Sequence, residues 1–297
     1  IDDVVSKIRG PKGSVVRLDV QSGDEGVDGP HKIVRIVRDK VKLEEQAASR
    51  KIIESGGKRI GVIELQAFYL DFEAARRGDA DARSATTDVR RLLQELKQEK
   101  VDGVVVDLRN NGGGSLIEAV ELTGLFIEQG PVVQVRETNG GVQVESDTDS
   151  SLAWSGPLAV LVNRSSASAS EIFAAAIQDY GRGLIIGEPT FGKGTVQTLI
   201  DLDKFPRRKD VQFGQLKMTI AQFFRINGGT TQNAAVTPDV LFPVSVDASE
   251  YGESTYDNAL PYTEIAAADY RKLGSLTLIG PQLKGQHQAR IAQDKEF

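Results

Sequence analysis

The sequence has no cysteine and few histidines, and both shortages narrow the chemistry open to it. Without cysteine, these 297 residues hold no disulfide, no zinc–thiolate site and no cysteine nucleophile. Only His31 and His287 are present, so a catalytic histidine must be one of these two. Apolar runs are short, as at Leu158–Val162, and none approaches the ~18 residues of a membrane-spanning helix. We therefore predict no transmembrane segment in this chain.

Positive charge is not in excess either. The 36 Lys and Arg residues stand against 42 Asp and Glu residues, for a net charge of −6. This balance argues against nucleic-acid binding through a broad basic surface, so we predict no nucleic-acid partner. With 40% hydrophobic residues, the composition is typical of a globular protein. The length fits about two domains or one large α/β domain.

The N-terminal residues are expected to be the end of a domain that begins further upstream. The chain opens on Ile1 in mid-pattern, without an initiator methionine or a signal peptide, which indicates a fragment. A short helix is predicted up to Ile8, and the alternation at 15–20 and 32–43 predicts a small antiparallel sheet. Residues 1–43 are too few for a good independent domain.

The centre of the sequence predicts an α/β core. Continuous apolar runs at 103–108, 158–162 and 183–187 are typical of strands covered on both faces. Helical spacing follows the first two runs, over 116–126 and up to Tyr180. This alternation indicates helices packed on a mostly parallel sheet. Other predicted elements are strands at 58–68, 131–136, 215–224 and within 234–246, a helix at 87–100, and a helical segment over 251–297.

Asn-Asn-Gly-Gly-Gly-Ser, at 110–115, joins the first buried strand to its helix. Glycines let the backbone approach a ligand closely, and free N–H groups at a helix N-terminus attract negative charge. The loop is therefore either an oxyanion hole or phosphate cradle, or simply a tight strand–helix turn.

A second turn, at 163–171, carries four serines after the next buried strand. A serine there lies at a strand end, where open α/β sheets place their sites. The alternative is that the serines only cap the helix, with Ser168 and Glu171 forming a capping box. Nothing local separates Ser168 from Ser165, Ser166 or Ser170.

A third loop, at 187–197, places Lys193 between two glycines. Gly187, Gly192 and Lys193 nearly fit the nucleotide loop G-x-x-x-x-G-K-[ST], but Gly194 stands where Ser or Thr is required. The residues at 196–199 also favour a strand over the helix that such a loop needs. Otherwise Lys193 is either a solvated hairpin lysine or a functional amine.

The three loops together favour a serine nucleophile with a lysine base. A serine needs a base to take its proton, and the usual base, histidine, occurs here only in polar segments outside the three loops. A lysine can serve when burial or neighbouring charges lower its pKa toward neutrality. Lys193 follows a core strand and is the candidate.

The motifs at 107–114, 166–171 and 187–194 resemble the carboxyl-terminal processing protease family, most closely its tail-specific branch in Gram-negative bacteria. The family separates nucleophile and lysine by 25 positions, which implies Ser168 and Lys193. Gln197 matches the glutamine that orients the lysine. Gly114, 54 positions before Ser168, and Ala169 match the backbone N–H donors of the oxyanion hole.

The resemblance also implies a fold and a setting. It implies a crotonase-like serine protease core at 44–246, a partial PDZ remnant at 1–43, with most of the PDZ domain upstream, and the start of a helical C-terminal segment at 247–297. It implies a periplasmic serine endopeptidase acting on proteins with apolar C-termini, a lipoprotein adaptor as partner, and no cofactor or metal.

Two other functions stay open at this point. A P-loop NTPase would bind nucleotide and magnesium through the third loop. A catalytically silent peptide-binding scaffold would use its serines only to cap a helix, and would form no adduct with a serine-reactive probe.

Overall fold

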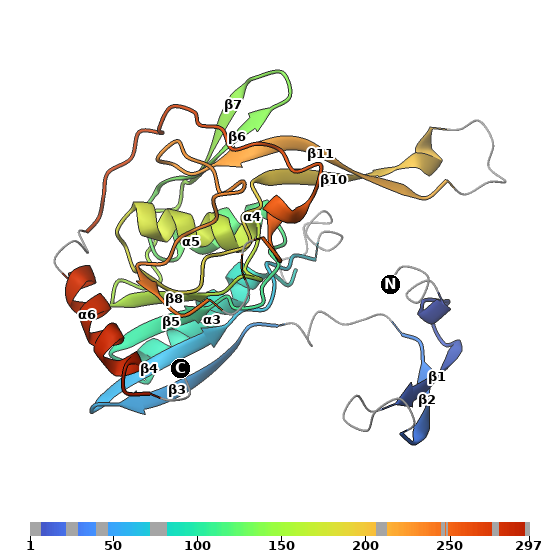
Figure 1. Cartoon of the computed structure of the whole chain (residues 1–297), viewed down its shortest axis with the longest axis horizontal. Helices are drawn as coiled ribbons and strands as arrows, with labels where there is room; N and C mark the ends of the chain where they lie inside the picture. The colour runs from blue at the N-terminus through green and yellow to red at the C-terminus, as the bar shows by residue number, and fades with distance from the viewer. Residues whose placement is uncertain are drawn as a thin grey trace. The chain divides into compact units, whose positions relative to one another are not determined.

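The computed structural model describes residues 7–21, 29–39, 47–71, 82–205, 213–244, 247, 249–274 and 279–294 (Figure 1). It has two compact units, Ile1–Glu45 and Gln46–Phe297. In the first, β1 (Val15–Gln21) and β2 (His31–Val37) pair antiparallel, as their alternating patterns predict. The expected domain boundary after residue 43 and the start of the predicted N-terminal helix lie outside the described residues.

A six-stranded sheet forms the core of the second unit, in the order β12-β9-β8-β5-β4-β3. Neighbouring strands are parallel except β3 and β4, which form an antiparallel hairpin at one edge. Val106, Val160 and Ile185, from three central strands, are fully buried, as continuous apolar runs predict. The predicted α/β class with a mostly parallel sheet is thus confirmed. The strands are β3 (Ser49–Ser55), β4 (Lys58–Glu64), β5 (Gly103–Asp107), β8 (Leu158–Val162), β9 (Leu184–Gly187) and β12 (Val240–Leu241).

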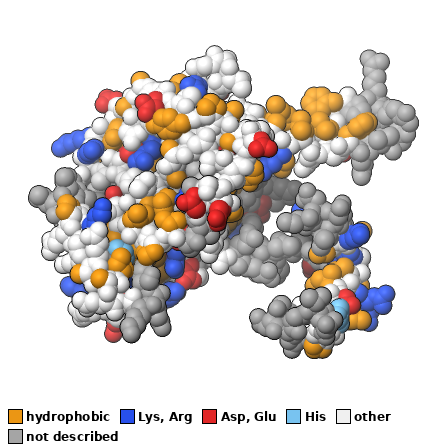
Figure 2. All heavy atoms as spheres, in the orientation of Figure 1, with side chains coloured by type: hydrophobic (Ala, Val, Ile, Leu, Met, Phe, Trp, Pro, Cys, Tyr) orange, Lys and Arg blue, Asp and Glu red, His pale blue; other side chains and the backbone are white. Residues whose placement is uncertain are grey.

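A second sheet, antiparallel throughout, has the order β10-β11-β6-β7. Its strands are β6 (Gly130–Glu137), β7 (Val142–Asp147), β10 (Thr195–Asp201) and β11 (Gln215–Phe224), and the 3-10 helix η3 (Leu202–Lys204) follows β10. The β10–β11 ribbon projects beyond its neighbours and exposes hydrophobic side chains, among them Leu199 and Met218 (Figures 1 and 2). The sequence pattern did not predict β3 or β7.

The helices that pack on these sheets include α3 (Ala85–Gln98), α4 (Leu116–Gly124) and α5 (Ala169–Asp179). Helices α4 and α5 lie between the two sheets (Figure 1). Phe173, in the middle of α5, packs against Phe68 and Phe126 with ring centroids 6.4 and 5.7 Å away. This burial fixes α5, and with it the turn at the helix N-terminus.

The C-terminal segment runs over the core before it becomes helical. A 3-10 helix, η4 (Glu253–Thr255), is followed by residues 256–274, which contain neither helix nor strand, and then by α6 (Ile279–Ile291). Backbone N–H groups of Ile265, Ala268 and Leu273 donate to carbonyls of the core, so tertiary hydrogen bonds replace helical ones here. Within the described residues, no helix is long and apolar enough to cross a bilayer.

Candidate active site

The turn with four serines at 163–171, here called the serine turn, places Ser168 at the N-terminus of α5. Ser168 has a φ of +58°, in the left-handed region that residues other than glycine seldom adopt. Strained backbone of this kind persists only where the surroundings impose it, and it is frequent at functional turns. A serine on a sharp strand-to-helix turn is also how many hydrolases expose their nucleophile.

The neighbouring serines serve the structure. Ser166 and Ser170 are completely buried. The Ser166 hydroxyl donates to the Leu108 carbonyl at 2.8 Å, and the Ser170 hydroxyl donates to the Asn111 carbonyl at 2.9 Å. Both hydroxyls therefore tie the serine turn to the glycine loop, residues 110–115, and to the segment that leads into it. The local sequence could not distinguish these two structural serines from Ser168.

Asn111 holds the glycine loop against the serine turn. Its buried side chain donates to the Leu65 carbonyl at 2.8 Å and accepts from the Gly113 N–H at 2.9 Å. A Cβ atom on Gly113 would lie 2.9 Å from the Cβ of Ser168, closer than packed carbon atoms come. A glycine is needed for this approach, since any side chain would push the two loops apart.

Two backbone donors remain beside Ser168. Within the described part of the chain, the N–H groups of Gly114 and Ala169 donate no hydrogen bond, whereas the Gly113 N–H is used by Asn111. Gly114 has a φ of +146°, and a Cβ atom on it would lie 2.3 Å from the Phe68 carbonyl oxygen. The donors predicted for an oxyanion hole are therefore both available.

The lysine loop, residues 188–194 between β9 and β10, leads directly into a strand and not into a helix. A phosphate-binding P-loop must open a helix, so the structure excludes the nucleotide-binding alternative. Lys193 Nζ donates to Gln197 Oε1, on β10, at 3.0 Å. Gln197 thus fixes the direction in which the Lys193 amine points.

Burial and three neighbouring charges set the pKa of Lys193. Burial of the amine lowers its pKa, because a desolvated ammonium is disfavoured, and the positive charge of Lys217 lowers it further. The carboxylates of Glu253 and Glu171 oppose this shift. The net lowering favours the neutral amine that a base requires.

Glu171 connects all these parts, although the sequence marked it only as a capping residue. One carboxylate oxygen accepts from the Thr190 hydroxyl at 2.6 Å and the Gly192 N–H at 2.7 Å. The other accepts from the N–H groups of Ser168 at 2.8 Å and Lys193 at 2.9 Å. Burial raises the pKa of Glu171 to about 7, while these four donors favour the ionised form. A single buried carboxylate thus joins the serine turn to the lysine loop.

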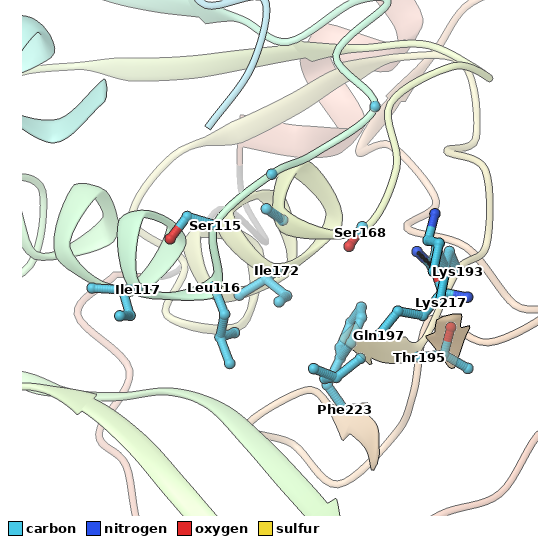
Figure 3. A pocket seen from close by; sticks show the side chains of 14 residues that line it. Ser115, Leu116, Ile117, Ser168, Ile172, Lys193, Thr195, Gln197, Lys217 and Phe223 are labelled. Carbon is cyan, nitrogen blue, oxygen red and sulfur yellow. Dashed lines mark hydrogen bonds between the residues drawn. The ribbon is translucent and has the colours of Figure 1, made fainter. Parts of the chain in front are cut away.

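One cavity of about 420 Å³ is lined by all five predicted site residues, Gly114, Ser168, Ala169, Lys193 and Gln197. Ser168 lies at the end of α5, and the side chains of Lys193 and Gln197 lie across from it (Figure 3). No hydrogen bond joins the Ser168 hydroxyl to the Lys193 amine among the described residues. Sequence reasoning missed Lys217, which also lines the cavity, because an exposed lysine on a strand gives no signal.

The histidines occupy other surroundings. His31 lies in the first unit, where Nδ1 is 3.1 Å from an Asp19 carboxylate oxygen. His287 lies on α6, stacked on Phe242 at 5.0 Å between ring centroids, and does not line the cavity. The described residues contain no cluster of three or more potential metal ligands.

Comparison with known proteins gives consistent matches over the whole chain. Peptidase family S41 matches residues 59–242, and the C-terminal domain of tail specific protease matches residues 246–297. The chain is 45% identical over its full length to the tail-specific protease of Haemophilus influenzae, and spans 41% of that relative. It is 30% identical to carboxyl-terminal-processing peptidase 2 of Arabidopsis thaliana chloroplasts, over 84% of the chain and 44% of the relative.

Among solved structures, the photosystem II D1 C-terminal processing protease is similar, with a TM-score of 0.56 and 27% sequence identity. The similarity covers 80% of this chain and 57% of that structure.

Proposed function

The chain belongs to peptidase family S41, and from this membership we propose that it is the catalytic part of a serine endopeptidase with a Ser168–Lys193 dyad. The observation that carries the proposal is that one cavity is lined by a strained serine, a half-buried lysine and two backbone N–H groups that donate no hydrogen bond. Nucleophile, base and oxyanion donors are the three parts that acyl transfer needs.

In the proposed first step, Ser168 Oγ bonds to the carbonyl carbon of a peptide while its proton passes to the neutral Lys193 amine. A neutral amine has one lone pair and two hydrogens, and a hydrogen donated to Gln197 leaves the lone pair free to face Ser168. The carbonyl oxygen takes on negative charge as the tetrahedral intermediate forms.

The N–H groups of Gly114 and Ala169 stabilise that negative charge, an interaction often worth about 3 kcal/mol for each donor. When the intermediate collapses, Lys193 gives its proton to the leaving amine and the C–N bond breaks. The acyl group stays on Ser168. Water then attacks the ester, Lys193 takes the water proton, and Ser168 recovers its hydrogen as the acid product leaves.

The setting of the whole protein is a further part of the proposal, because the chain spans only 41% of the tail-specific protease it matches. We propose substrates that are unfolded or loosely folded proteins with apolar C-termini, a periplasmic location and delivery by a lipoprotein adaptor. Residues 1–43 would then be the end of a PDZ domain that captures the substrate terminus, 44–246 the protease core and 247–297 the start of a C-terminal segment.

The test is proteolysis of an unfolded protein with an apolar C-terminus, measured beside a serine variant. Ser168→Ala should abolish turnover, whereas the control Ser165→Ala, in the same turn, should keep most of it. Labelling with a serine-reactive probe should modify Ser168 in the parent only.

Full activity in Ser168→Ala would refute the assignment of the nucleophile. A parent that neither cleaves nor takes the probe would support the silent peptide-binding scaffold, in which the serine turn only begins a helix.

A further inference from the structure

A second cavity, of about 410 Å³, adjoins the first on the side of Lys193. The two cavities share Lys193, Thr195, Gln197 and Lys217, and only the first is lined by Ser168. The shared residues come from the lysine loop and the β10–β11 ribbon. A chain lying along this ribbon would therefore pass from one cavity into the other.

The far wall of this second cavity comes from the C-terminal segment and includes Tyr256 and Leu260. The completely buried amide of Gln232 holds that wall to the lysine loop. Gln232 Nε2 donates to Glu253 Oε1 at 3.1 Å and to the Leu260 carbonyl at 2.9 Å, and Gln232 Oε1 accepts from the Gly194 N–H at 2.8 Å.

Aromatic rings also pack between the lysine loop and the C-terminal segment. The ring of Phe191, in the lysine loop, lies with its centroid 6.3 Å from that of Tyr256 and 5.4 Å from that of Tyr251. The Glu253 N–H also donates to the Phe191 carbonyl at 3.1 Å. These contacts attach the wall of the second cavity to the lysine loop.

The chemistry of the proposed reaction gives the two cavities different roles, and the inference rests on that proposed function. The base must deliver its proton to the leaving amine, so the part of the substrate after the cleaved bond lies on the Lys193 side. The acyl part stays near Ser168 and the oxyanion donors. The second cavity, lined by Lys193 and not by Ser168, is on the leaving side.

Lys217 supplies charge to this cavity. Its side chain is exposed and makes no ion pair with any described residue. Of the other charged groups that line this cavity, Glu253 is buried and its carboxylate accepts from Gln232, so Lys217 is the exposed charge, and Lys193 must be neutral to act as a base. Glu171 is completely buried and does not line the cavity. We propose that this cavity receives the substrate residues that follow the cleaved bond, and that Lys217 makes the enzyme favour an acidic side chain there.

The experiment uses peptides with one cleavage site, mapped by mass spectrometry, that carry Asp, Asn or Lys at the second or third residue after the cut. The parent should show a kcat/KM about fivefold to tenfold higher for Asp than for Lys, as expected of one exposed charge pair replaced by repulsion. Lys217→Glu should reverse this order, and Lys217→Gln should remove it. Lys204→Glu makes the same charge change in η3, which follows β10 and lies outside the lining of both cavities, and should leave the preference unchanged.

A second peptide set carries the same substitutions before the cut, where Lys217→Glu should change kcat/KM much less. Equal effects of Lys217→Glu on all peptides, or a preference confined to residues before the cut, would overturn the inference. A parent that cleaves without any preference for charge after the cut would overturn it too. A parent that cleaves no peptide would instead refute the proposed function.

Discussion

Among single residues, Lys193 is the one whose substitution should affect catalysis most clearly, because its surroundings disfavour the positive charge that lysine normally has. An ordinary lysine has a pKa of about 10.4 and is charged at neutral pH. Burial and the nearby Lys217 lower the pKa of Lys193 in the folded chain. We expect Lys193→Met to reduce kcat by about a hundredfold to ten-thousandfold, the usual cost of losing a general base. Lys193→Arg should be as inactive, since arginine does not deprotonate.

The same shift sets a dependence of stability on pH. Between the lowered folded pKa and the ordinary value, the unfolded chain binds more protons at Lys193 than the folded chain does. The unfolding free energy should therefore gain a rising contribution over that range, and Lys193→Met should remove it. Urea unfolding of both proteins from pH 7 to 10.5 measures this, and identical slopes would contradict the lowered pKa.

Among the elements, the end of helix α5 is tied to the end of β11 by an ion pair between the buried Asp179 and Arg225, whose side chain is 16% exposed. Arg225 Nη2 and Nε donate to the two carboxylate oxygens of Asp179 at 2.6 and 3.0 Å, and Arg225 Nη2 also donates to Gln178 Oε1 at 2.9 Å. Helix α5 begins beside Ser168 and β11 pairs with β10, so this contact connects the two sides of the cavity.

Breaking that pair should cost stability, because it leaves one buried charge without its partner. We expect Asp179→Asn to lower the unfolding free energy by about 3 kcal/mol, within the range for buried pairs. Arg225→Met should cost a similar amount, and the double variant less than the sum, since neither charge then remains. Denaturant unfolding of the four proteins checks this, and strictly additive losses would show that the two side chains do not interact.

For the whole molecule, the question is where substrate capture lies. We propose that residues 1–43 are the end of a PDZ domain, and β1 and β2 are the strands that the structure describes in the first unit. We expect a longer protein with a complete PDZ domain to be stimulated several-fold by a free peptide with an apolar C-terminus. The present chain should show no response. Equal stimulation of both in a proteolysis assay would place substrate sensing in the core.

Much of this protein can be predicted from local pattern. Continuous apolar runs of this length are typical of buried parallel strands, because such strands are covered on both faces. The β5, β8 and β9 strands followed this rule. The motifs at 107–114, 166–171 and 187–194 also led to the family, and the family's separation of 25 residues between nucleophile and lysine then selected Ser168. Strands β3 and β7 were missed because their polar, half-exposed patterns give weak signals.

Other features depend on contacts between residues far apart in the chain, which no local pattern contains. Ser166 and Ser170 look like Ser168 in sequence, and only their burial against Leu108 and Asn111 gives them a structural role. Glu171 looks like a helix cap until the loop at 190–193 folds onto it. The lowered pKa of Lys193 likewise arises from desolvation and from Lys217 on β11, and both exist only once the chain has folded.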